Sequence, residues 1–261
     1  MIVLSLALAL LSQVGLASPP NAQSWAWDDK VPICTLKQQP SPGTSAVTIE
    51  RTPGNEETEL LIVLPPASRP GEGHYLNAEI LTDSGRTFVA DIAIGGKMGL
   101  YVDSPDPRLI DSLPGAKWLQ ISHPKIRPVR IDISIPSEIV RLLRVCEDQT
   151  MPDWGIDAAA WRGLHRRPMP LEHVRERFSA LDYPTEALAA NIEADAVMRL
   201  DIGTDGAVRK CGAVNTGLQR TAFESASCRV LKGAKFRPAE DANGKPTSAP
   251  IVYDVRFRIG R

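Results

Sequence analysis

Residues 46–136 are dominated by short segments in which apolar and polar side chains alternate. Examples are AVTIER, YLNAEIL, TFVADIAIGG and VRIDISIP, and Pro-Gly, Ser-Gly and Gly-Gly pairs separate such segments. Alternation at a period of two places apolar side chains on one face of a β-strand, while glycine and proline mark turns. The pattern predicts an α+β protein whose N-terminal part is an antiparallel β-sandwich or barrel-like domain.

The periodicity becomes helical at residues 137–148. Ile139, Leu142, Leu143 and Cys146 recur at helical spacing, and Ser137 precedes them as a candidate N-cap. We expect this helix to close the β-rich domain, which spans residues 24–148.

Residues 149–179 carry a different, basic pattern. The segment WRGLHRRPMPLEHVRERF has two interrupting prolines and no sustained apolar period before Leu171. We interpret it as a solvated, basic linker that ends in a short helix. The alternative is that this segment binds an acidic surface weakly through its positive charges.

The last part of the chain, residues 180–261, alternates helical and strand patterns. TEALAANIE predicts a short helix, Thr204-Asp205-Gly206 a hairpin turn between two strands, and RTAFESASCRVLKGA a second helix. The final strand has the clearest alternation in the protein. One face comprises Ile251, Tyr253, Val255, Phe257 and Ile259, and the other comprises Val252, Asp254, Arg256 and Arg258.

Composition and the N-terminus indicate a globular, exported protein. The chain has 261 residues, of which 43% are hydrophobic and 23% charged, and its net charge of −1 gives no bulk attraction to nucleic acid. Residues 2–11 form an apolar run that is short for a membrane span, and the small residues Gly15 and Ala17 suit a signal peptidase. We predict a cleaved signal peptide at residues 1–17 and a periplasmic location. An uncleaved inner-membrane anchor is the alternative.

The four cysteines fit an oxidising compartment. Three pairings are possible. The pairing Cys34–Cys146 and Cys211–Cys228 staples each folded segment separately and is favoured. Free buried thiols are the alternative.

No motif for catalysis or cofactor binding is apparent in the sequence. It contains no Gly-x-Ser-x-Gly, no His-Glu-x-x-His and no phosphate-binding glycine loop. The cysteine spacing does not suit a metal site. The four histidines are dispersed along the chain; they are His74, His123, His165 and His173. We therefore expect a non-enzymatic protein with no cofactor, no metal, no nucleic-acid partner and no small-molecule substrate.

Several separate motifs follow one another in the C-terminal part. They are YPTEAL, VMRLDIGTDGAV, NTG, AFESASCRVL, KFRPAEDANGKP and VYDVRFRI. Together they resemble the C-terminal domain of TonB-family energy transducers over residues 183–259, and Cys211 with Cys228 resembles the disulfide-bearing variants of that family. The family landmarks are Tyr183, Pro184, Asp205, Gly206, Phe236, Pro238, Ala239, Gly244 and Pro246.

The resemblance implies a two-helix, three-stranded module that binds other proteins. In such modules an extended partner segment adds to the edge of the last strand, which must then border solvent. Phe236 and Pro238 would anchor the chain before a turn at DANG. A strand that only stabilises the sheet is the alternative. The residues expected to contact the partner are Ile251, Val252, Tyr253, Asp254, Val255, Arg256, Phe257 and Arg258.

The chain departs from energy transducers at its N-terminal side. It has a signal-like start instead of an uncleaved anchor, and a folded β domain instead of a long Pro-rich spacer. We therefore hypothesise a periplasmic protein that binds a protein partner, with the periplasmic segment of an outer-membrane receptor as best candidate and a link to TonB-dependent transport. The alternative is an envelope adaptor or inhibitor-like protein that binds peptidoglycan or a secreted partner without transducing energy.

Overall fold

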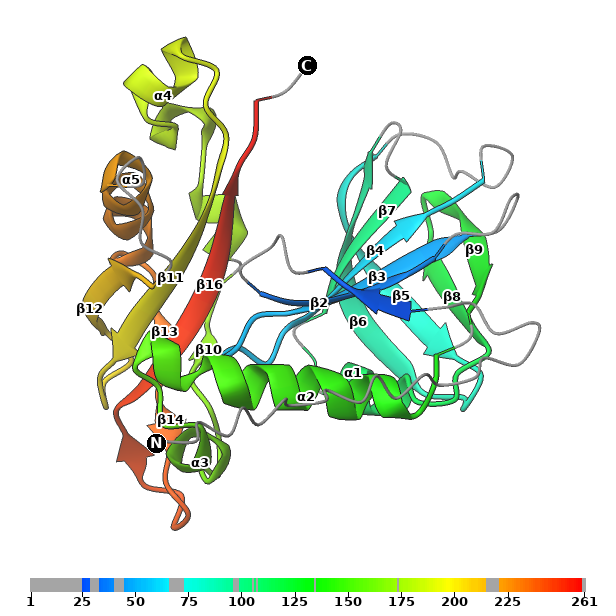
Figure 1. Cartoon of the computed structure of the whole chain (residues 1–261), viewed down its shortest axis with the longest axis horizontal. Coiled ribbons are helices and arrows are strands. Elements are labelled where there is room, and N and C mark those ends of the chain that lie inside the picture. The colour runs from blue at the N-terminus through cyan, green and yellow to red at the C-terminus, as the bar shows by residue number, and fades with distance from the viewer. Residues whose placement is uncertain are drawn as a thin grey trace, which may run out of the picture.

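The computed structural model describes residues 25–28, 33–39, 45–65, 73–95, 99–104, 106, 108–133, 135–172, 174–214 and 221–259. They form an N-terminal unit (residues 25–150), a connecting segment (151–178) and a C-terminal unit (179–259), shown in Figure 1. The predicted signal peptide lies outside the described residues, as do His173 and the NTG motif.

The N-terminal unit contains one nine-stranded sheet in which every pairing is antiparallel. The strand order is β1-β2-β3-β4-β7-β6-β5-β8-β9. The strands are β1 (Trp25–Trp27), β2 (Cys34–Gln38), β3 (Ala46–Arg51), β4 (Thr58–Val63), β5 (Gly73–Thr82), β6 (Thr87–Gly95), β7 (Gly99–Ser104), β8 (Trp118–His123) and β9 (Ile126–Asp132).

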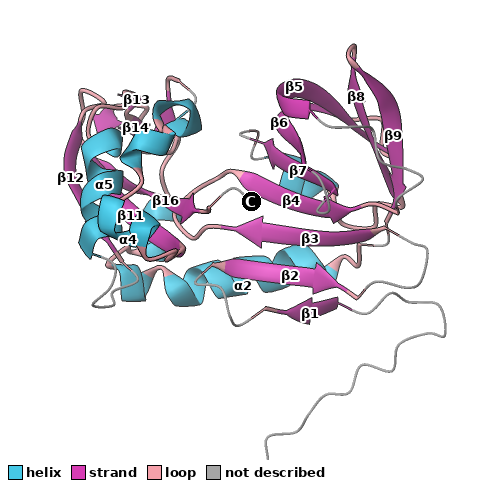
Figure 2. Cartoon of the chain, turned by 90° about the horizontal axis from the view of Figure 1, so that it is seen from above, coloured by secondary structure: helices cyan, strands magenta, loops and turns pink. Residues whose placement is uncertain are grey.

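The unit combines this large antiparallel sheet with few helices, so the α+β class is correct, and the described strands form one continuous sheet. The sheet twists strongly between β4 and β8, as strands of L-residues require, and Figure 2 shows the change in strand direction. Alternating residues of β3 and β4 point into a single apolar core, where Ile49, Leu60 and Ile62 are fully buried.

Two helices complete the N-terminal unit: α1 (Arg108–Ser112) and α2 (Glu138–Thr150). Ile139 and Leu143 of α2 are buried in the core of the sheet, as the helical spacing predicts, and the predicted Leu142 and Cys146 are partly buried against it. Val140, which lay outside the predicted stripe, is also buried there. Ser137 occupies the N-cap position, but its side chain makes no capping hydrogen bond, which corrects the predicted capping role. The predicted disulfide between Cys34 and Cys146 is present, with the two Cα atoms 5.9 Å apart, and it ties α2 to β2.

The connecting segment is built from short elements, and its side chains contact both units. The elements are the 3-10 helices η2 (Pro152–Trp154) and η3 (Val174–Arg177), helix α3 (Ala158–Arg162) and the two-residue strand β10 (Met169–Pro170). Met151, Trp154, Ile156 and Trp161 are at most 8% exposed. The interpretation of this segment as a solvated linker is therefore wrong. The basic residues suggested exposure, and the four buried apolar side chains follow no simple helical or strand period.

The C-terminal unit has a three-stranded antiparallel sheet of order β12-β11-β16. Its elements are η4 (Ala180–Asp182), α4 (Thr185–Ala189), β11 (Ala194–Ile202), β12 (Val208–Ala213), α5 (Thr221–Leu231), β13 (Phe236–Arg237), β14 (Ala239–Glu240), β15 (Pro246–Thr247) and β16 (Ala249–Phe257). The predicted disulfide between Cys211 and Cys228 joins β12 to α5. The pairs β10–β13 and β14–β15 were not predicted, because two-residue strands carry no periodic signal.

Candidate functional site: the outer edge of β16

Strand β16 is the last strand of the C-terminal sheet, and in Figure 1 it lies on the side of that sheet toward the N-terminal unit. Its register with β11 pairs Ile251 with Leu200 and Tyr253 with Met198. The N–H and C=O groups of Val252 point away from β11, because both bond to other partners. Since backbone direction alternates along a strand, the groups of Asp254 and Arg256 also face outward.

The first half of this outer edge is occupied by the protein's own chain. The Val252 N–H donates to the carbonyl oxygen of Gly54 at 3.2 Å, and Asn55 Nδ2 donates to the Val252 carbonyl oxygen at 2.9 Å. The Pro250 carbonyl oxygen accepts a hydrogen bond of 3.3 Å from Trp161 Nε1. The expectation that the edge borders solvent along its length is therefore wrong at Pro250 and Val252. No strand pairs with this edge in the part of the chain that the structure describes.

The contact depends on a close approach at Gly54. This residue has φ +80, a region that favours glycine, and it lies in the loop of residues 52–57 between β3 and β4, here called the docking loop. A Cβ atom at Gly54 would lie 2.9 Å from Ile156 Cδ1 and 3.0 Å from Val252 Cγ2. A larger residue would therefore crowd the contact of the docking loop with Ile156 and Val252.

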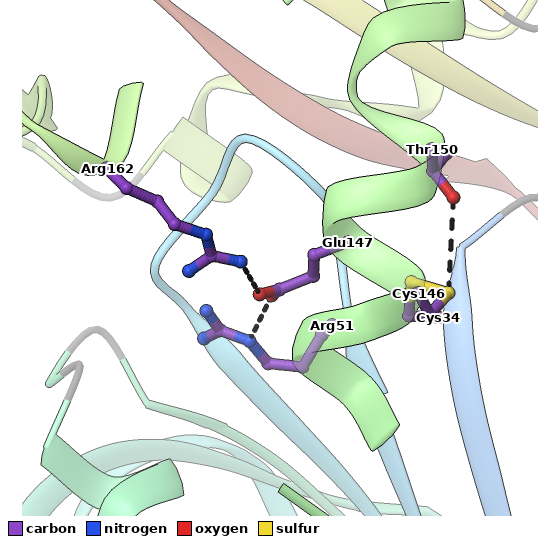
Figure 3. The surroundings of a disulfide bond; sticks show 6 residues. All are labelled: Cys34, Arg51, Cys146, Glu147, Thr150 and Arg162. Carbon is purple, nitrogen blue, oxygen red and sulfur yellow. Dashed lines mark hydrogen bonds and ion pairs between the residues drawn. A yellow bond between two sulfur atoms is a disulfide. The ribbon is translucent and has the colours of Figure 1, made fainter. Parts of the chain in front are cut away.

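Arg51 holds the docking loop in shape. Its guanidinium donates to the carbonyl oxygens of Asn55, Glu56 and Glu57, at 2.5–3.2 Å. It also donates through Nε to Glu147 Oε1 at 2.9 Å, and both side chains are at least 90% buried. Glu147 follows Cys146 on α2. The ion pair of Arg51 with Glu147 therefore lies beside the Cys34–Cys146 disulfide, as Figure 3 shows.

An apolar cluster lies behind the hydrogen bonds of the edge. Val252 is fully buried there, and it packs with Val197 of β11 and with side chains of the connecting segment and the N-terminal unit. The other cluster members are Ile33, Met151, Trp154, Ile156 and Trp161. The face of β16 that carries Val252 is thus covered near Val252, whereas the alternation alone predicted one apolar and one charged face.

Arg256 forms ion pairs across the two units. Its guanidinium contacts Glu50 Oε2 and, at 3.2 Å, Glu59 Oε2 of the N-terminal unit, and it also pairs with Asp254 on the same strand at 2.6 Å. The Asp254 side chain is 4% exposed and the Glu50 side chain 9%. These carboxylates are largely removed from water, so their pairing with Arg256 matters more than a surface ion pair does.

Arg175 of η3 makes a second set of contacts with the N-terminal unit. Its guanidinium pairs with Glu59 Oε1 at 2.8 Å and with Asp103 Oδ2 at 3.0 Å, and it donates to the hydroxyl of Tyr101. The same guanidinium lies over the Tyr101 ring, 4.8 Å from its centroid. Arg175 and Arg256 therefore meet a single acidic surface of the N-terminal unit, formed by Glu50, Glu59 and Asp103.

Burial shifts the acidities of this cluster. It raises the pKa of Asp254 and of Asp103 to about 6, against the opposing effect of Arg256 and Arg175. It also raises the pKa of Glu57 in the docking loop. Within the described residues, Asp103 Oδ1, Asp254 Oδ1 and the Tyr253 hydroxyl are buried without a hydrogen-bond partner. This part of the interface between the units is thus polar and acidic, and some of its buried polar atoms have no hydrogen-bond partner among the described residues.

Four of the family landmarks meet at one place, away from the outer edge of β16. Asp205 and Gly206 form the turn after β11, and the Gly206 carbonyl oxygen accepts a hydrogen bond from the Phe236 N–H at 3.1 Å. A Cβ at Gly206 would lie 1.9 Å from the Phe236 carbonyl oxygen and 3.7 Å from Pro238 Cδ. These landmarks therefore hold the turn after β11 against the segment that contains Phe236 and Pro238. Phe236 also packs against Tyr253 of β16, with ring centroids 6.2 Å apart.

The remaining landmarks shape the ends of the unit. Tyr183 stacks edge-on with Phe223 and Phe257, and its hydroxyl donates to the Ile192 carbonyl oxygen at 2.7 Å. Pro184 is the N-cap of α4. Ala239 is fully buried, and Gly244 has φ +75 in the turn between β14 and β15, where Pro246 begins β15. In the part of the chain that the structure describes, none of these residues makes a hydrogen bond or ion pair with the outer edge of β16.

The residues that close the edge were not among the predicted site residues. They are Arg51, Gly54, Asn55, Glu59, Trp161 and Arg175. The TPGN segment at residues 52–55 does carry a turn signal, which could have marked a loop. Its contact with a strand nearly 200 positions later has no local signature.

Neither a metal site nor a membrane-spanning helix emerges from the residues placed in space. Among them no three histidine, cysteine, aspartate or glutamate side chains are grouped so as to hold a metal ion. No helix in that same part of the chain has the length and apolar character needed to cross a membrane.

The C-terminal unit corresponds to a known family. The sequence model of the family described as Gram-negative bacterial TonB protein C-terminal matches residues 179–259. This match agrees with the resemblance identified from residues 183–259. No curated protein matches the chain closely enough to count as a relative.

Proposed function

We propose that this chain is a non-enzymatic protein of the periplasm, exported through a cleaved signal peptide at residues 1–17. Its C-terminal unit binds an extended segment of a protein partner along β16. The family match supports an envelope protein, because domains of the TonB C-terminal family typically interact with outer-membrane receptors. The best candidate partner is therefore the periplasmic segment of such a receptor, in connection with transport across the outer membrane.

One observation carries this proposal: the outer edge of β16 is hydrogen-bonded by a loop and a tryptophan side chain, not by a strand. Backbone groups on such an edge bond readily to an incoming extended chain, and side-chain contacts then select its sequence. The contact residues are Ile251, Val252, Tyr253, Asp254, Val255, Arg256, Phe257 and Arg258, of which Val252, Asp254 and Arg256 offer outward backbone groups.

The proposal is tested by site-specific photo-crosslinking with the full chain in envelope preparations. A photoreactive residue replaces Arg258, which is half exposed and directly follows β16, or Lys210, which is exposed on the opposite edge strand β12. We expect a protein adduct from position 258 and a much weaker one from position 210. Adducts from position 210 alone would contradict the use of β16. Co-sedimentation with sacculi and no protein adduct would favour the peptidoglycan-binding adaptor.

A further inference from the structure

The docking loop occupies backbone groups that an added strand would use. Gly54 accepts from the Val252 N–H, and Asn55 donates to the Val252 carbonyl oxygen. An extended partner along β16 would make both of these bonds itself, because Val252 is the first outward-facing residue that offers a donor and an acceptor. Loop and partner segment therefore cannot occupy Val252 together.

The contacts with the N-terminal unit also show that acidic side chains fit beside the outer edge of β16. That unit presents Glu50 and Glu59 to Arg256, and Glu59 and Asp103 to Arg175. When the units separate, Arg256 keeps its ion pair with Asp254, whereas Arg175 loses its ion pairs with Glu59 and Asp103. A replacement for the N-terminal unit must bring carboxylates to the same arginines or leave their charge unmatched.

We infer that the docking loop is a built-in competitor for β16, and that the segment which displaces it is an extended, acidic peptide of a partner protein. This inference rests on the proposed function. It adds how access to β16 is regulated and which kind of peptide binds there. In the described chain the loop makes two hydrogen bonds to the backbone of β16, one through the Gly54 carbonyl oxygen and one through the Asn55 side chain. A longer extended segment can also bond the outward backbone groups of Asp254 and Arg256, so it can form more hydrogen bonds with β16 than the loop does.

The glycines of this chain provide a matched pair of variants. Gly54→Ala places a Cβ 2.9 Å from Ile156 and 3.0 Å from Val252 at φ +80. Gly85→Ala is made at φ +77, where no atom lies within 4 Å of the added Cβ. Both variants therefore place an alanine at nearly the same positive φ, and of the two only Gly54→Ala crowds the contact between the docking loop and β16, which we expect to loosen that contact.

The first readout needs no ligand. Amide hydrogen exchange at Val252 is measured in the full-length wild type and both variants, with Tyr253 as reference because its amide faces β11. We expect Val252 to exchange about tenfold faster in Gly54→Ala and at the wild-type rate in Gly85→Ala, with Tyr253 unchanged. An unchanged Val252 rate in Gly54→Ala overturns the inference.

The second readout uses defined probes: a fluorescein-labelled octapeptide that alternates Glu and Thr, and the same peptide with Gln in place of Glu. We expect the Glu peptide to bind Gly54→Ala about tenfold more tightly than wild type or Gly85→Ala, the gain expected when one or two competing hydrogen bonds are removed. The Gln peptide should bind more weakly. Arg256→Gln, added to Gly54→Ala, should abolish the preference for Glu.

The outcomes separate the inference from the proposed function. Equal binding of the Glu peptide to wild type and Gly54→Ala overturns the competitor and leaves strand addition standing. Equal binding of the Glu and Gln peptides overturns the acidic preference. Binding of neither peptide to Gly54→Ala, although Val252 exchanges rapidly, overturns the proposed function together with this inference.

Discussion

Asn55 Nδ2 donates a 2.9 Å hydrogen bond to the carbonyl oxygen of Val252, a residue 197 positions later in the chain. The donor lies in the N-terminal unit and the acceptor on the last strand of the C-terminal sheet. Both residues are at most 5% exposed. This bond therefore connects the N-terminal unit to β16, the strand that we propose binds the partner.

Asn55→Ala should destabilise the protein and loosen the edge of β16. The substitution leaves the buried Val252 carbonyl oxygen without its donor, which costs about 2 kcal/mol. Urea unfolding measures the loss of stability. Asn243→Ala, at an exposed turn, is the control and should have little effect. Equal effects of the two substitutions would show that the Asn55 bond contributes nothing.

Arg256→Gln should cost more than removal of a surface cation. It leaves Glu50, Glu59 and Asp254 without the guanidinium that pairs with all three, a loss of about 3 kcal/mol in the free energy of unfolding.

The matched control for Arg256→Gln is Arg209→Gln. Arg209 pairs with Asp205, and both side chains are more than half exposed, so this change should cost less than about 1 kcal/mol. Chemical denaturation of both variants checks the comparison. A loss at Arg256 no larger than the loss at Arg209 would contradict the role given to the acidic surface.

Stability should fall as the pH rises from 5 to 7.5. Burial raises the pKa of Asp254 and Asp103 from 3.8 to about 6, so the folded protein binds protons that the unfolded chain has already released. This contribution is complete below the unfolded pKa and disappears as the pH rises through about 6. The charged groups that act on these two carboxyls are Arg175, Arg256, Glu59, Asp91 and Asp195.

The melting temperature, measured across this pH range, should decrease by several degrees in the wild type. Asp254→Asn mimics the protonated carboxyl and should make the profile less steep, because Asp103 still titrates, whereas Asp132→Asn changes a carboxyl that is 89% exposed and should leave the slope unchanged. A flat wild-type profile, or an Asp254→Asn profile as steep as that of the wild type, would refute this pH dependence.

The two disulfides should contribute unequally. They close chain segments of 112 and 17 residues, so loop-closure entropy assigns about 4–5 kcal/mol to Cys34–Cys146 and about 3 kcal/mol to Cys211–Cys228. Thiol labelling of unfolded, unreduced protein should find no free sulfhydryl.

Double Cys→Ala variants of each pair give the two contributions separately. Loss of Cys34–Cys146 should also increase exchange at Val252, because this bond holds α2 beside Arg51 and the docking loop. A larger destabilisation from loss of Cys211–Cys228 would contradict the entropic ranking.

Local patterns were sufficient to predict much of the fold. Alternation identified β3, β11 and β16, helical spacing identified α2 and α5, and the turn at Asp205-Gly206 was placed correctly between β11 and β12. Both disulfide pairs follow from the rule that each staples its own unit. These features depend on neighbours in sequence, which is where periodicity carries information.

The relation between the two units could not be predicted in this way. Alternation groups Val252 with Asp254 and Arg256 on one face of the strand, yet Val252 is fully buried because Trp161, Ile156 and the docking loop cover it. The arginines of the connecting segment suggested a solvated chain, whereas Arg175 pairs with Glu59 and Asp103 at the interface. Such contacts join residues more than 70 positions apart, and no local pattern encodes them.

The most direct test of strand addition is residue-resolved amide exchange in the full-length Gly54→Ala protein, with and without the Glu–Thr octapeptide. The account predicts an alternating result: added protection at the outward amides of Val252, Asp254 and Arg256, and none at Tyr253 and Val255, which already face β11. Protection confined to β12, or no new protection at β16 while the peptide is bound, would contradict it.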